Sequence, residues 1–218
     1  MRPEPLIIGF DTSAAHCAAA LLQGDRILVE ATEPMDKGQA ERLVPLLEDL
    51  LASADVGWRD LSAIGVGIGP GNFTGVRIAV ATARGLALGL GVPAIGISGL
   101  EALAHGIPGV RVASIDARQG RLYLQTFGTF DGTRPVLCDI DTLPAIPARA
   151  EPLCIGHRAE EIADRCAGQP AAPVHSLPAA IAHIAALRRF STATRPAPLY
   201  LRPADAAPSR DVAPRILP

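Results

Sequence analysis

Residues 6–34 read LIIGFDTSAAHCAAALLQGDRILVEATEP, and this stretch decides how the chain begins to fold. It contains three short apolar runs, at residues 6–10, 17–22 and 27–31. A polar triplet follows the first run, and Gly24-Asp25 is a strong turn signal between the second and the third. Short apolar runs joined by tight turns are typical of strands that pair with their neighbours. The stretch therefore predicts an antiparallel meander of three strands.

The pattern changes after the meander. Leucines recur at helical spacing over residues 39–54, and a second apolar helix is expected over 74–90. Strands are expected at 61–68 and 93–97, and a short helix at 100–105. The order of three strands, then helix, strand, helix, strand is typical of ribonuclease-H-like lobes, the building block of actin-like ATPases. Fold analogy of this kind indicates architecture and not function.

The second half carries weaker signals. Strands are expected at 110–116 and 122–127, around a turn at 118–120, and a third at 153–156, with helices at 159–166 and 177–190. A proline-rich tail starts at residue 194 and is expected to lie extended on the surface. Pro108 between two glycines suggests a boundary. We therefore predict an α/β actin-like ATPase (ribonuclease-H-like) fold with two lobes, 1–107 and a smaller 108–218, each with a mixed sheet flanked by helices.

Composition excludes several classes of protein. The 218 residues carry 20 basic and 22 acidic side chains, a net charge of −2, and the arginines are scattered among acids. A nucleic-acid-binding protein that works alone normally shows a clustered basic surface, so an RNA role would have to depend on a partner. The four cysteines lie far apart and form no CxxC pair, which favours reduced thiols. No run approaches the roughly 20 apolar residues of a membrane span, so we expect a cytoplasmic protein.

Two segments are candidates for ligand binding. Asp11-Thr12-Ser13 comes at the end of the first strand, where a carboxylate can hold Mg²⁺ and backbone amides can hold phosphate. The loop from Gly69 to Gly75 leads into a helix, and glycines such as Gly69 and Gly71 allow the backbone to turn sharply before a helix N-terminus that can bind an anion. The structural alternative is a strand cap in the first case and a tight turn in the second. We expect at most a vestigial nucleotide site, formed by Asp11, Thr12, Ser13, Gly69 and Gly71.

The sequence shows no convincing catalytic or metal centre. The five histidines form no HxxH, HxxxH or HExxH motif, and there is no GxSxG motif. His175 and His183 lie eight residues apart, on an expected loop and helix, which makes them poor co-ligands. Asp116-Ala117-Arg118 could supply an acid and a base, although an ion pair at a strand end is the simpler reading. We therefore predict no catalytic residues and no metal ligands.

Both helices of the first half carry more apolar surface than a single core needs. The second is apolar almost all round, with small-residue ridges at a spacing of four that permit close helix packing. Such a surplus predicts a protein–protein interface, unless the second lobe covers it. The predicted interface residues are Leu43, Leu47, Leu50, Arg77, Val80, Ala83, Arg84 and Ala87.

Five stretches together resemble one known family, and they span nearly the whole chain. They are residues 7–13 (IIGFDTS), 41–47 (ERLVPLL), 69–78 (GPGNFTGVRI), 116–118 (DAR) and 198–202 (PLYLR). In order and spacing they are similar to the TsaB (YeaZ) family, and the glycine-proline-glycine loop before Thr-Gly-Val-Arg is the most specific of them. Two positions depart from the family pattern: Gln39-Ala40-Glu41 stands where His-Ser-Glu is common, and Asn72 where serine is commoner.

The resemblance implies a two-lobed actin-like fold without activity of its own. Such a subunit forms a homodimer when alone. In the working state it pairs with and activates the catalytic paralogue TsaD, which a TsaE-type ATPase joins. The complex places threonylcarbamoyl on the tRNA adenosine beside the anticodon, so tRNA would be met only through the complex, and no membrane is involved. No cofactor is expected, and a vestigial ATP/ADP site would be filled only in the complex. Two alternatives remain open: an active nucleotide-dependent actin-like kinase or ATPase, and a glycoprotease-like metallopeptidase.

Overall fold

The computed structural model describes residues 4–129, 133–146, 151–191 and 195–202. Its first sheet has the strand order β3-β2-β1-β4-β5. The strands β1 (Leu6–Asp11), β2 (His16–Gln23) and β3 (Arg26–Pro34) form the predicted antiparallel meander, and β4 (Leu61–Gly67) and β5 (Ala94–Ile97) run parallel to β1. The helices α1 (Gln39–Ser53) and α2 (Phe73–Leu90) connect β3 to β4 and β4 to β5. A 3₁₀ turn, η1 (Trp58–Asp60), precedes β4.

The second sheet repeats the same path. Its order is β10-β9-β6-β7-β8. The strands β6 (Arg111–Asp116), β7 (Arg121–Phe127) and β8 (Val136–Asp139) form an antiparallel meander, and β9 (Leu153–Gly156) and β10 (Gln169–Ala171) run parallel to β6. A short η2 (Ile140–Thr142) follows β8, and α4 (Ala159–Cys166) joins β9 to β10. The predicted fold of two lobes, each with a mixed sheet flanked by helices, is confirmed. The sequence analysis missed β8, β10 and the internal repeat.

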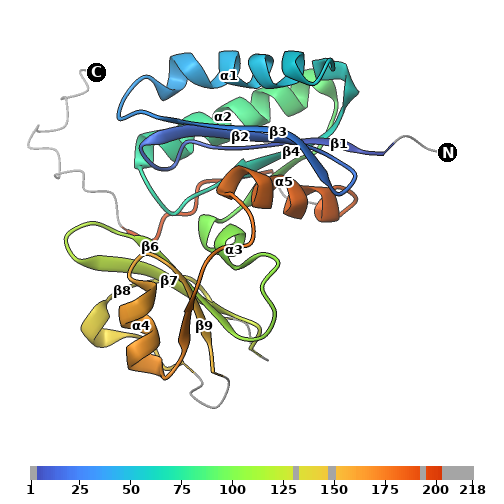
Figure 1. Ribbon diagram of the computed structural model, residues 1–218. Coiled ribbons are helices and arrows are strands. Elements are labelled where there is room, and N and C mark those ends of the chain that lie inside the picture. The colour runs from blue at the N-terminus through green and yellow to red at the C-terminus, as the bar shows by residue number, and fades with distance from the viewer. Residues whose placement is uncertain (1–3, 130–132, 147–150, 192–194, 203–218) are drawn as a thin grey trace, which may run out of the picture.

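The lobes exchange their last helices. Helix α3 (Gly99–Ala104) follows β5 of the first lobe but packs on β6, β7 and β9 of the second. Helix α5 (Leu177–Arg188) follows β10 of the second lobe but packs on β1, β2 and β4 of the first. Figure 1 shows both helices between the two sheets, where they also contact each other. The predicted division at 107/108 follows the chain but is wrong for α5, because this helix contributes to the core of the first lobe.

Helices cover both faces of the first sheet. α1 and α2 lie on one face, where α1 leucines such as Leu43 and Leu47 pack with Phe10 and Ile64. α5 lies on the opposite face (Figure 1), very close to the backbone of the sheet. A Cβ atom at Gly9 would come within 2.6 Å of Ala182 N and Pro178 O, so only glycine permits this approach. The buried alanines of α5 fit the same close packing.

The chain makes one more crossing after α5. Residues 195–202 lie in an extended segment, as predicted, and contact both lobes. The Leu199 amide donates to Ile68 O at 2.8 Å, and an Arg202 guanidinium nitrogen donates to Ala117 O at 3.1 Å. The tail beyond residue 202, which the sequence analysis also expected to be extended, lies outside the described residues.

Candidate functional site

The predicted ligand residues come together at one end of the first sheet. Asp11 ends β1, and the loop from Gly69 to Gly75 packs directly against the turn that follows it. The Thr12 hydroxyl donates to Gly75 O at 2.7 Å, and the Asn72 amide donates to Ser13 O at 2.6 Å. The structure therefore brings the predicted residues into one cluster.

The cluster is closed by its own backbone. A Cβ atom at Gly75 would lie 1.8 Å from Thr12 O, and one at Gly71 would lie 2.3 Å from Ser13 O. Two amides at the start of α2, those of Thr74 and Gly75, already donate to the Asn72 side chain at 3.0 and 3.1 Å. Amides that cap their own helix are not available to phosphate oxygens. This geometry fits a tight structural turn better than a nucleotide cradle.

Asp11 is the exception to this closure. Only 1% of its surface is exposed. Its Oδ1 accepts hydrogen bonds from the Ser13 amide and hydroxyl, both at 2.8 Å, and lies 2.9 Å from His16 Nε2. Its Oδ2 is buried without a hydrogen-bond partner in the described part of the chain and faces Gly67, where a Cβ would lie 1.8 Å away. Among the described residues, Asp11 thus has one carboxylate oxygen, Oδ2, without a hydrogen-bond partner, whereas the His16 ring lies beside Oδ1.

The predicted partner interface needs correction. Five of its residues are buried: Leu43, Leu47, Leu50, Val80 and Ala83. All of these except Val80 belong to the core cluster that the two helices form with the first sheet. Arg77 and Arg84 are exposed and Ala87 is partly exposed. Helical periodicity identified the apolar stripe correctly, but that stripe faces inward.

A different set of residues forms the outer face of the two helices. Leu88 is 84% exposed, and Val44 and Phe73 are also exposed. Gly85 and Gly89 form a smooth strip beside Leu88, since a Cβ at either position would meet nothing within 4 Å. We define the α1–α2 face as Val44, Phe73, Ala81, Gly85, Leu88 and Gly89. The sequence signal that could have found it is the apolar character of α2 on the side opposite Ala79 and Ala83.

The α2 helix is long and apolar enough to cross a membrane by length and composition, and it is the one helix in the described residues that passes this test. Its position argues for another role. It connects β4 to β5, two hydrogen-bonded neighbours of one sheet, and its inner side packs on that sheet. Leaving the sheet would dismantle the lobe, so α2 is placed as a packed helix of the first lobe with an exposed apolar outer side.

Two aromatic rings and an arginine border this face. Arg77 Nε donates to the Tyr200 hydroxyl at 2.8 Å, and the Arg77 guanidinium lies 3.6 Å from the centre of the Phe73 ring. Tyr200 belongs to the extended segment after α5, and its ring centre lies 5.0 Å from that of Phe73. The contacts fix the start of α2 to the segment that joins both lobes.

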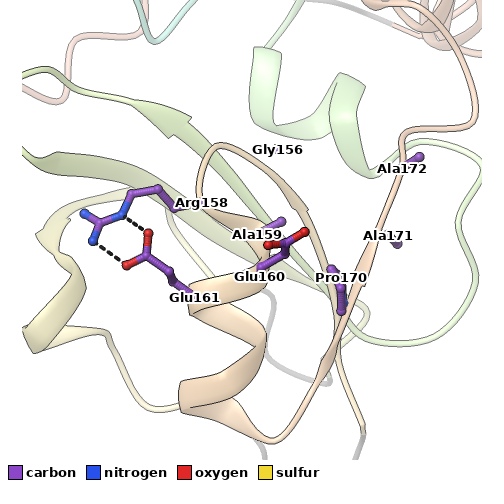
Figure 2. Close-up of a pocket in the computed structure, with 8 residues that line it drawn as sticks. All are labelled: Gly156, Arg158, Ala159, Glu160, Glu161, Pro170, Ala171 and Ala172. Atoms are coloured by element: carbon purple, nitrogen blue, oxygen red, sulfur yellow. Dashed lines mark hydrogen bonds and ion pairs between the residues drawn. The ribbon is translucent and has the colours of Figure 1, made fainter.

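The second lobe offers little for catalysis. Asp116 accepts a hydrogen bond from the Arg118 amide at 2.8 Å and lies 3.9 Å from His157 Nε2, so it closes a turn and pairs with histidine rather than with the Arg118 guanidinium. A hollow of about 550 Å³ lies near the ends of β9 and β10. Figure 2 shows that Arg158, which lines this hollow, is paired with Glu161, while Glu160 lies nearby. The two hydrogen bonds of this pair are 2.8 and 2.6 Å long. With two glutamates and one arginine in its lining, the hollow lacks the positive charge that would favour an anionic phosphate.

The repeated sheet order, the exchanged helices and the closed ligand loop define a two-lobed protein of the actin-like ATPase fold class. Two crystal structures from Pseudomonas aeruginosa share it over the whole of their own chains. One, described as an uncharacterized protein with similarity to peptidase YEAZ, has a TM-score of 0.74 and 27% identity over 91% of this chain. The other, YeaZ, has a TM-score of 0.68 and 26% identity over 90%.

Sequence relatives agree. The family model "TsaD: tRNA N6-adenosine threonylcarbamoyltransferase" matches residues 33–140. The tRNA threonylcarbamoyladenosine biosynthesis protein TsaB of Escherichia coli is 38% identical over 54% of this chain. An uncharacterized protein of Mycobacterium tuberculosis is 31% identical over 93% of this chain and 94% of its own length. The chain belongs to the TsaB (YeaZ) family. It spans about half the length of the TsaB relatives that it matches, 52% in the case of E. coli.

Proposed function

We propose that this chain is a non-catalytic subunit of a tRNA threonylcarbamoyladenosine synthase. In this role it docks its α1–α2 face on a TsaD-type catalytic paralogue and activates it. The names of the TsaB relatives support the proposed pathway, and the exposed α1–α2 face supports the proposed interface. A TsaE-type ATPase joins this pair, and tRNA is bound only through the complex. In the absence of the paralogue, the same face closes a homodimer.

One observation carries the proposal. Leu88 is 84% exposed beside the open strip of Gly85 and Gly89. A large side chain next to a smooth strip of glycines is a self-complementary shape, and small residues let two helices approach closely. The face is also bordered by Arg77 and Arg84, which can pair with acidic groups at the rim of a partner.

The proposed lack of catalysis rests on two other observations. In the part of the chain that the structure describes, no three His, Cys, Asp or Glu side chains are placed to hold a metal ion. The loop that would hold a phosphate uses its amides internally, as described above. These facts weigh against the metallopeptidase and the kinase. The observation that keeps the nucleotide-dependent alternative testable is the unpaired Asp11 Oδ2.

The decisive experiment is light-scattering chromatography of the chain alone and mixed with its TsaD-type paralogue. We expect a homodimer that converts into a one-to-one heterodimer. Leu88→Glu should abolish both assemblies. Leu187→Glu is the matched control, because Leu187 is 76% exposed but lies on α5, on the opposite face of the sheet. A monomer that never pairs, or equal effects of the two variants, would overturn the proposal.

A calorimetric titration with Mg-ATP tests the alternative. Heat of binding in the wild-type chain that disappears in Asp11→Asn would favour a nucleotide-dependent enzyme. No heat at millimolar nucleotide would remove that alternative and leave the scaffold role.

A further inference from the structure

Three histidines from distant parts of the sequence meet in space. His105 follows the last residue of α3, His175 lies in the loop before α5, and His183 lies on α5. The ring centres are 5.6 Å apart for His105–His175, 4.6 Å for His175–His183 and 6.1 Å for His105–His183. We call these residues the histidine trio. All three are half-buried.

The trio lies where the two exchanged helices cross. α3 packs on the second sheet and α5 on the first, so the contact between them joins the lobes. An ion pair crosses the same contact: an Arg188 guanidinium nitrogen on α5 donates to Glu101 Oε2 on α3 at 3.2 Å. Gly106, which begins the connection into the second lobe, lies against the Val174 and His175 side chains. The connection from α3 to β6 and the connection from β10 to α5 therefore both pass the trio.

The surroundings of His105 and His183 favour uncharged rings. Burial is the main cause that lowers the pKa of His105, with His175 and Arg188 adding repulsion and Glu101 opposing it. Burial also lowers the pKa of His183, with repulsion from His175 and His105, while Asp25 in the β2–β3 turn opposes it. The charged groups that face the trio are thus Glu101 from α3, Arg188 from α5 and Asp25 from the first sheet.

The sign of the pH dependence follows from these directions. Histidines with a lower pKa in the folded chain bind fewer protons there than in the unfolded chain. Their contribution to the free energy of unfolding is therefore complete above the ordinary histidine pKa of about 6.5 and falls as the pH drops below it. Protonated rings would repel one another and Arg188.

A metal site would be a different use of three histidines, but the ring geometry does not support one. The rings lie side by side, with interplanar angles of 32°, 28° and 37°. The described residues hold no group of three potential ligands arranged for a metal ion.

We propose that the histidine trio is an acid-sensitive latch between the lobes: its uncharged rings hold α3 against α5, and protonation loosens this contact. The latch acts through the packing of the subunit itself and is independent of the proposed partner. In acid, the two lobes separate at α3 and α5 while each sheet stays folded.

Hydrogen exchange of the full chain at pH 7.5 and pH 5.5, corrected for the intrinsic rates, tests the proposal. We expect the protection of amides in α3 and α5 to fall between pH 7.5 and pH 5.5, while the protection of amides in α1 stays unchanged. Equal behaviour of α3, α5 and α1 at both pH values would overturn it. The imidazole resonances of His105 and His183 should titrate below the ordinary value; titration at or above that value would also overturn it.

Histidine-to-glutamine variants distinguish the proposed latch from a general loss of stability in acid. His183→Gln should reduce the pH-dependent loss of protection in α3 and α5, and His105→Gln provides the same test if the first variant does not fold. His157→Gln is the control, because His157 is exposed in the second lobe and outside the trio. Loss of pH dependence in the control, or none in either trio variant, would contradict the proposal. Tight Zn²⁺ binding that shifts all three ring resonances would replace the latch by a metal site.

Discussion

The two lobes follow the same path through their sheets but differ in what covers them. In the first lobe, α1 connects the third and fourth strands, and the 18-residue α2 connects the fourth and fifth. In the second lobe, the described residues between β8 and β9 hold only the turn η2, and α4 is 8 residues long. The strands of its parallel half are short as well, with 4 residues in β9 and 3 in β10.

This difference shows how one topology can serve two purposes. The first lobe has helices on both faces of its sheet and still exposes apolar surface on α2, so it has material for an interface. The second lobe needs α3 from the first lobe to complete its core, where Leu100 and Ala104 pack with Tyr123. We therefore propose that the first lobe is the binding lobe, whereas the second lobe takes part of its core from the helix exchange.

The largest expected effect breaks that exchange. Gly9→Val should lower the free energy of unfolding by about 3 kcal/mol or more, because the new side chain meets the backbone of α5. Urea unfolding measures the loss. Gly99→Ala on α3 is the control: its Cβ would lie 3.0 Å from Ile115 Cδ1, the movable end of a side chain, and at an ordinary contact distance of 3.9 Å from Gly69 O. Equal losses in the two variants would mean that α5 is not held more tightly than α3.

A second prediction compares how often each lobe opens. Cys17 in the first lobe and Cys154 in the second are both fully buried. Burial raises the pKa of Cys17, and burial together with the Cys166 thiol raises the pKa of Cys154 to about 12, so both need opening before a reagent can modify them at pH 8. We expect Cys154 to be labelled about tenfold faster than Cys17, since the less covered lobe opens more readily.

Mass spectrometry of time-resolved alkylation identifies the modified sites. The partly exposed Cys138 serves as the internal control and should react first. Labelling of Cys17 and Cys154 at one common rate would show that the lobes open as a single unit.

The parts of the fold that sequence predicted are those with local signals. The meander was predicted because the polar triplet at 11–13 and the Gly24-Asp25 turn separate its apolar runs, and the loop from Gly69 to Gly75 because its glycines allow a sharp turn before a helix. β10 was missed because it has only three residues and contains Pro170, which is a poor strand signal. The sequence also could not show which lobe α5 packs against. A helix with buried residues on most sides shows that it is covered, but not by which lobe.

The same limit explains the errors in the candidate site. Periodicity places Leu43 and Leu47 on an apolar stripe, but it cannot tell whether that stripe meets the chain's own sheet or a partner. The structure assigns both to the core and leaves Leu88 outside. The histidine trio had no signal at all, because its first member is 70 residues away from the second and only the helix exchange brings them together.

A smaller effect is expected at the start of α2. The Asn72 side chain caps this helix, whereas its counterpart α4 has Arg158 at the N-cap position, without a side-chain hydrogen bond to the helix. Asn72→Ala should cost about 1 kcal/mol in the free energy of unfolding. Asn72→Ser, which keeps a capping oxygen, is the control and should behave nearly as wild type. If chemical unfolding shows the same loss for both, a contribution other than the cap is responsible.

The smallest effect tests the binding lobe most directly. Gly85→Ala should stabilise the isolated chain by up to about 1 kcal/mol, because glycine is a poor residue inside a helix and the added Cβ meets nothing within 4 Å. In the proposed complex the same methyl group would occupy the strip where a partner helix approaches. A higher melting temperature together with weaker pairing, measured by light scattering, is therefore the expected combination. A gain in stability with unchanged pairing would show that the interface does not include Gly85, in a variant whose two lobes are both still folded.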